Sequence, residues 1–145
     1  MAIEVTEAAA LHLSHSRIKN QPVLSNWMHV QDYRINRLAH EPVEHFVILC
    51  LDNQNRLIGE ETMSISTINQ TAVYLREVVN AALKHHARSV ILVHNHPSGE
   101  AKPSRADIAV TRDIEKALTV MGMTLNDHLI IADTICVSFK SLGHL

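Results

Sequence analysis

Hydrophobic positions along this chain recur with two different periods, which predict strands and helices in alternation. Two apolar runs, 45–51 and 56–58, flank the turn-forming stretch 52–55, and this arrangement predicts a β-hairpin. Apolar positions at helical spacing predict a helix over 71–86, whose last residues include cationic side chains that suit a helix C-terminus.

The alternation continues through the second half of the chain. The β-branched run 89–93 predicts a strand buried on both faces. Ser104 then opens a helical pattern that runs to Met121, and Gly122 favours a left-handed stop. Two further strands are predicted, over 129–132 and 135–138. These elements predict an α/β fold, a three-layer-like sandwich in which helices flank a mixed β-sheet.

The chain is expected to form one domain preceded by a loosely attached arm. Its 145 residues, 46% of them hydrophobic, are enough for a single core. We expect an arm over 1–24, with a short helix around 6–13 and a break at 19–22, and a domain over 25–145. Ser25 would cap a helix predicted over about 26–39.

Charge and composition restrict the partners and the compartment. Thirteen Lys and Arg against 15 Asp and Glu give a net charge of −2, and aromatic residues make up only 3%. Nucleic-acid binding is therefore weakly supported, because it normally needs grouped cations. No apolar run reaches the roughly 18 residues that cross a bilayer, and no basic secretory leader is present, so we expect a cytoplasmic protein. Cys50 and Cys136 lie in apolar runs and are expected to be buried thiols.

The stretch from His94 to Asp107 carries the candidate chemistry. In an extended chain His94 and His96 point to the same side, so both imidazoles can reach one ion. The intervening loop, with two prolines and a glycine, lets Asp107 return to them. Two nitrogens and one carboxylate leave a fourth position for water, as in catalytic zinc sites. Alternatively, the histidine pair is a chance occurrence among 11 histidines, and Ser104 with Asp107 is only a helix capping box.

The same residues resemble a known signature. His94-x-His96-Pro97 followed by Ser104-x-x-Asp107 resembles the JAMM motif of the MPN metalloprotease fold, which is cytidine-deaminase-like, and the string HNHPSGEAKPSRADI closely resembles its RadC branch. The similarity runs from about Glu44 to the C-terminus. Residues 1–24 have no counterpart of the helix-hairpin-helix region of full-length RadC proteins, so the chain resembles a short stand-alone form.

The resemblance implies roles for five residues. One zinc ion per chain would be held by His94, His96 and Asp107, and Glu44 would exchange protons with the activated water. Ser104 would hydrogen-bond the developing oxyanion. Without the resemblance, Glu44 is simply an exposed acid at the start of a strand, and other divalent metals also bind two histidines and an aspartate. Weaker candidates for the acid are Glu41, Glu60 and Glu61.

Some positions depart from the RadC pattern or stay open. Ser66-Thr67-Ile68 and Leu75 stand where RadC-like chains usually have Gly-Thr-Leu and proline, which changes the expected shape of a substrate groove. Three histidines are interpreted as solvated or core residues, with His128 also a candidate support for a ligand: His85, His86 and His128.

Three functions remain in competition. The first is a zinc-dependent hydrolase that cleaves an amide bond of a polypeptide substrate, as a peptidase or isopeptidase. The second is a DNA-repair-associated or nucleic-acid-processing protein, and the third is a non-catalytic MPN interaction module. A homo-oligomer is compatible with exposed sheet edges. The identity of the substrate is not encoded in any motif.

Overall fold

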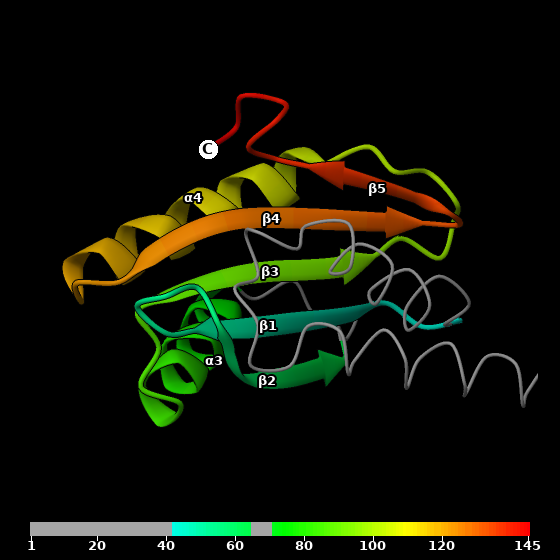
Figure 1. Ribbon diagram of the computed structural model, residues 1–145. Helices are drawn as coiled ribbons and strands as arrows, with labels where there is room; N and C mark the ends of the chain where they lie inside the picture. The colour runs from blue at the N-terminus through cyan, green and yellow to red at the C-terminus, as the bar shows by residue number, and fades with distance from the viewer. Residues whose placement is uncertain (1–41, 65–70) are drawn as a thin grey trace, which may run out of the picture.

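The computed structural model describes residues 42–64 and 71–145, and the side chains of 64 and 71–73 are not described. The helices expected over 6–13 and 26–39, and the break at 19–22, lie outside these residues. The described elements follow in the order β1 (His45–Leu51), β2 (Leu57–Ser64), α3 (Thr71–Lys84), β3 (Ser89–Asn95), α4 (Arg105–Val120), β4 (Thr124–Ala132) and β5 (Ile135–Ser138) (Figure 1).

The strands form one mixed sheet in the order β2-β1-β3-β4-β5. Strands β3 and β4 are parallel and are joined by α4, because parallel neighbours need a crossover, whereas the other pairs are antiparallel. Every residue of β3 is buried, as expected for the central strand. The predicted α/β class and mixed sheet are confirmed.

Both described helices pack on the same face of the sheet, behind it in the view of Figure 1. The buried cluster between helices and sheet includes Phe46, Ile48, Cys50, Val78, Ala82, Val90, Leu92, Ile114 and Leu118. A second buried cluster lies on the opposite face and includes Val47, Leu49, Ile91, Val93, Leu129 and Ile131. Within 42–64 and 71–145 the fold therefore has two layers, and the helix predicted over 26–39 is not among them.

Two strands are longer than the sequence predicted. β2 continues from the predicted 56–58 to Ser64, and its mostly polar last six residues, GEETMS, pair with β1 throughout. Polar residues are tolerated there because β2 is at the edge of the sheet that the described residues form. β4 begins at Thr124, five residues before the predicted 129, and β3 runs on to Asn95.

The helix ends differ less from the predictions. α3 ends at Lys84, because His86 has a φ of 53° that a right-handed helix cannot continue through. α4 starts with the predicted capping box: the Ser104 hydroxyl accepts from the Asp107 N–H at 3.0 Å, and the Asp107 carboxylate accepts from the Ser104 N–H at 2.8 Å. Gly122, with a φ of 77°, follows the end of α4 as predicted.

Two further expectations concern the thiols and the membrane. Cys50 is buried, Cys136 is partly buried, and both are free. Burial raises the pKa of the Cys50 thiol to about 12 and that of Cys136 to about 11, which keeps both unreactive. Neither α3 nor α4 has the length and apolar character that crossing a bilayer requires.

Candidate metal centre

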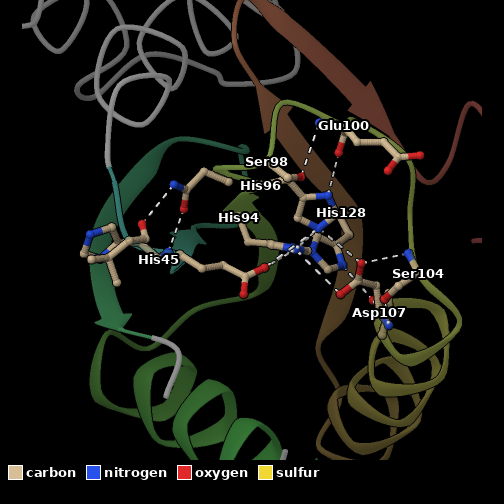
Figure 2. A network of polar contacts seen from close by, with 12 residues as sticks. His45, His94, His96, Ser98, Glu100, Ser104, Asp107 and His128 are labelled. Carbon is tan, nitrogen blue, oxygen red and sulfur yellow. Dashed lines mark hydrogen bonds and ion pairs between the residues drawn. The ribbon is translucent and has the colours of Figure 1, made fainter. Parts of the chain in front are cut away.

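Four side chains from distant parts of the chain converge at one end of β3. His94 lies in β3, His96 follows it, Asp107 is in the first turn of α4, and Glu44 directly precedes β1. The Nε2 atoms of His94 and His96 are 2.8 Å apart. Oε1 of Glu44 lies 3.4 and 3.8 Å from these two nitrogens, and the Asp107 oxygens lie 3.6 and 3.4 Å from them. Figure 2 shows His94, His96 and Asp107 facing one another.

Strand pairing explains why Glu44 reaches the histidines. β1 runs antiparallel to β3, with Phe46 opposite His94, so the start of β1 lies beside the end of β3. The loop after β3 then turns back towards α4. Its first residue, His96, donates its N–H to the carbonyl of Ile131 at 2.8 Å, and Gly99, with a φ of 84°, closes a turn on the carbonyl of His96. The return of the chain that the two prolines and the glycine predicted is thus observed.

The donor set has the chemistry of a divalent-cation site. Glu44, His94 and His96 each offer one ligand atom within 4.8 Å of the others, and the Asp107 carboxylate lies beside both histidines. Two atoms that each lie 2.0–2.1 Å from a tetrahedral zinc are about 3.3 Å apart, close to the separations found here. Carboxylate oxygens and bare imidazole nitrogens repel one another at such distances unless a cation or a proton lies between them. The residues present therefore fit a metal ion.

The electrostatics of the pair His96 and Asp107 reflect this crowding. A hydrogen bond to Asp107 raises the pKa of His96, against the opposing effect of burial. Burial alone would raise the pKa of Asp107, but the hydrogen bond from His96, the charge of His94 and the hydrogen bond from the Ser104 N–H together hold it well below its usual range. Asp107 is therefore ionised and held in place by its neighbours.

A buried histidine stands directly behind His94. Nε2 of His128 lies 2.9 Å from Nδ1 of His94, and the hydroxyl of Thr111 lies 2.6 Å from Nδ1 of His128. His128 is fully buried, and burial, followed by the charge of His94, lowers its pKa well below the usual value. The sequence suggested that His128 supports a ligand, and its contact with His94 has the geometry for this role. Thr111 was not identified from the sequence.

Asn95 is a second residue that the sequence analysis missed. Its side chain is 2% exposed, accepts from the His45 N–H at 2.6 Å and donates to the Val43 carbonyl at 3.0 Å. The amide thus spans the backbone on both sides of Glu44 and fixes that residue beside His94. An amide between two histidines at the end of an apolar strand was the available signal.

The other candidates lie elsewhere or keep a limited role. Glu61 pairs with Lys84 at 2.8 Å and with His85 at 3.0 Å, and Glu60 stands opposite Leu49 in the β1–β2 ladder. Glu41 lies outside the described residues. The exposed Ser104 hydroxyl accepts from the Asp107 N–H at the edge of the site, so its own proton is still available for donation.

Comparison with known proteins agrees with this arrangement. The family model described as RadC-like JAB domain matches residues 24–144. The chain is 45% identical over 143 residues to a UPF0758 protein of Rhodobacter capsulatus, covering 99% of this chain and 67% of the relative. It is 39% identical over 143 residues to a UPF0758 protein of Ruegeria pomeroyi and 42% identical over 139 residues to one of Marinomonas, covering 99% and 96% of this chain.

The chain spans between 62% and 67% of the length of these three relatives, and their names state a family and no reaction. The family model extends over both histidines, the aspartate and Glu44, and thus over all four side chains that converge at the end of β3. The chain therefore belongs to the RadC-like JAB domain family.

Proposed function

We propose that this protein is a zinc-dependent hydrolase of the JAMM type, which cleaves an amide bond of a polypeptide substrate in the cytoplasm. The observation that carries the proposal is a pair of imidazole nitrogens 2.8 Å apart at the end of β3, with the carboxylates of Glu44 and Asp107 each 3.4–3.8 Å from both nitrogens. A bound divalent metal would supply Lewis acidity and a water whose pKa is near 7. The side chains around the ion would hold it, transfer protons and hydrogen-bond the substrate.

The two carboxylates are suited to different tasks. Asp107 is 19% exposed and is held by the capping box, so it presents its oxygens in a fixed position, as a ligand must. Glu44 is 36% exposed, and its position is set through its backbone neighbours. We assign His94, His96 and Asp107 as ligands and Glu44 as the general acid and base.

In this assignment Glu44 accepts a proton from the attacking water and later gives it to the leaving amine. A carbon–oxygen bond forms, the carbon–nitrogen bond breaks, and the amine departs neutral. Ser104 can donate its hydroxyl proton to the developing oxyanion while it continues to accept from the Asp107 N–H. Capping of α4 and catalysis are thus compatible at one residue.

The first test is the metal content of the untagged protein, measured by elemental analysis after reconstitution with zinc. We expect close to one zinc per chain in the wild type and in Glu44→Gln, and a large loss in Asp107→Ala. Glu61→Gln is the matched control, because Glu61 also contacts a histidine but lies away from the centre. A wild-type protein that holds no metal after reconstitution would refute the proposal and favour an interaction module.

Activity is then measured with pooled fluorogenic peptides and an isopeptide-linked substrate. We expect cleavage by the wild type and Glu61→Gln, and none by metal-loaded Glu44→Gln. Cleavage that persists in Glu44→Gln would contradict the role of Glu44 as acid and base. Hydrolysis of a phosphodiester in place of the peptides would favour nucleic-acid processing, and the absence of any cleavage by zinc-loaded protein would favour the interaction module.

A further inference from the structure

We propose that Thr111 and His128 form a hydrogen-bond relay that fixes the tautomer of His94, so that its Nε2 always faces the metal centre as a bare lone pair. Both would be positioning residues, since neither contacts the centre directly. The direction of the relay follows from the atoms that cannot donate. Its consequence for metal affinity rests on the proposed function, whereas the tautomer itself does not.

The relay starts at a backbone carbonyl. The Thr111 hydroxyl lies 2.6 Å from the carbonyl oxygen of Asp107, one turn earlier in α4. A carbonyl can only accept, so the single hydroxyl proton lies between these two oxygens. The Thr111 oxygen then offers only lone pairs to its other neighbour, Nδ1 of His128, which is also 2.6 Å away. Nδ1 of His128 must therefore carry a hydrogen.

The same reasoning assigns the hydrogens on the ring nitrogens between His128 and the candidate metal centre. A neutral imidazole has one N–H, so Nε2 of His128 is bare and accepts from Nδ1 of His94 at 2.9 Å. With its hydrogen on Nδ1, His94 turns a bare Nε2 towards the carboxylates. In the reverse order the oxygens of Thr111 and Asp107 would face each other at 2.6 Å without a proton between them, which is repulsive.

His96 also carries its hydrogen on Nδ1 and has a bare Nε2, through a different hydrogen bond. Its Nδ1 lies 2.8 Å from the carbonyl oxygen of Glu100, which can only accept, so Nδ1 carries the hydrogen. The two bare Nε2 atoms then lie 2.8 Å apart, and the carboxylates of Glu44 and Asp107 lie 3.4–3.8 Å from them. Two bare nitrogens beside two carboxylates repel one another, and a cation in the centre relieves this repulsion. Two carbonyls, of Asp107 and Glu100, therefore prepare both imidazoles for a metal.

Packing holds the relay in one geometry. Thr111 and His128 are fully buried and His94 is 1% exposed, so water does not compete for their hydrogen bonds. The ring of His128 stacks on Phe139, with 4.3 Å between centroids and 21° between planes, and meets the edge of Phe46 at 5.6 Å. His128 cannot turn its ring without displacing both aromatic neighbours.

Thr111→Val removes the acceptor while keeping the shape of the side chain. His128 would then have a buried N–H without a partner, and it can avoid this by moving the hydrogen to Nε2. Nε2 of His128 would then donate to Nδ1 of His94. The hydrogen of His94 would shift to its own Nε2, where the carboxylates accept it. We therefore expect the tautomers of His94 and His128 to invert in Thr111→Val and to be restored in Thr111→Ser.

The experiment reads the tautomers by long-range ¹H–¹⁵N NMR of the histidine rings in the metal-free full chain at about pH 9, above the usual histidine range. We expect hydrogens on Nδ1 of His94, His96 and His128 in the wild type. Thr119→Val is the matched control, because Thr119 makes the same type of bond, to the Glu115 carbonyl at 2.8 Å, on the exposed side of α4. Backbone NMR spectra confirm that each variant is folded.

Zinc affinity, measured by competition with a chelator, is the second readout. We expect a loss of about 10- to 100-fold in Thr111→Val, recovery in Thr111→Ser and no change in Thr119→Val. A wild-type His94 with its hydrogen on Nε2, or Thr111→Val tautomers identical to the wild type, would overturn the relay. The expected tautomers in a protein that binds no zinc would support the relay and refute the proposed function instead.

Discussion

Replacing Asn95 with alanine tests how the structure places the proposed acid and base. The Asn95 side chain bonds the backbone at His45 and at Val43, with distances of 2.6 and 3.0 Å, and it is 2% exposed. Glu44 lies between these two anchor points. Asn95→Ala removes both hydrogen bonds at once and leaves a cavity at the end of β3.

The expected cost follows from the two bonds. Val43 is exposed, so loss of the bond to its carbonyl costs about 1 kcal/mol, whereas loss of the bond from the half-buried His45 N–H costs about 1–3 kcal/mol. We therefore expect Asn95→Ala to lower the free energy of unfolding by about 2–4 kcal/mol. Asn95→Asp gives no rescue, because its second oxygen would face the Val43 carbonyl and its charge would be buried.

The assay is urea unfolding of the metal-free protein, followed by circular dichroism. Asn126→Ala is the control, because the Asn126 amide makes one side-chain bond, to Ser89 at 3.0 Å, away from the centre. We expect this control to cost about 0.5–1.5 kcal/mol. Equal losses in the two alanine variants would refute the reasoning that Asn95 secures the segment around Glu44.

Three further predictions concern other contacts. Gly59→Ala would place a Cβ against the ring of His85, so we expect the free energy of unfolding in urea to fall by about 1–3 kcal/mol, and by less when His85→Ala is added. An unaffected Gly59→Ala would contradict this packing. Hydrogen bonds from Lys84 and then His85 lower the pKa of Glu61, so its contribution to stability is present above the usual value of 4.5 and is lost as the pH falls through the lowered pKa. Glu61→Gln and Lys84→Met should both flatten the acid limb of a stability–pH curve, and a limb that stays unchanged in both would argue against the contact. Zinc at about 100 times its dissociation constant should raise the free energy of unfolding of the wild type by about 2.7 kcal/mol, as measured by unfolding with and without zinc. We expect a much smaller gain in Asp107→Ala, and equal gains in the two proteins would show that zinc binds elsewhere.

Local spacing was enough to predict the parts of the site that are close in sequence. His94 and His96 are two residues apart at the end of a strand, and period two alone puts them on one side. Asp107 is in the first turn of a helix whose cap, Ser104, is recognisable by itself. Glu44 depended on the resemblance, because the antiparallel pairing of β1 and β3 that brings it to His94 leaves no mark in the local sequence.

The residues that were missed bond to partners far along the chain. Asn95 acts on a segment 50 residues earlier, and Thr111 acts on His128, 17 residues later. A threonine inside an amphipathic helix is common and does not stand out. The asparagine between the two histidines is a visible signal, but its backbone partners become identifiable only once the strand order is known. The polar part of β2 was missed for a related reason. Pairing with β1 holds these residues in a strand, although they lack the apolar run by which a central strand is predicted from sequence.

The position of His128 depends on one irregularity of the sheet. Between Val90 and Ile91 the register with β4 shifts, from Val90 opposite Leu125 to Ile91 opposite Asp127, so β4 holds one extra residue there. A shift of one residue exchanges the two faces of a strand. Leu125 therefore lies on the helix face although it is three residues before His128, which lies on that face beside Thr111.

Without the extra residue in β4, a strand with Leu125 in the helix-side core would turn His128 to the opposite face, away from His94. The bulge thus sets the face of β4 from which His128 contacts His94, behind the candidate metal centre. It also breaks the apolar alternation over 124–128, which explains why the sequence predicted this strand only from residue 129. The same irregularity that prevented the sequence from predicting residues 124–128 as a strand also places His128, the residue proposed to orient His94.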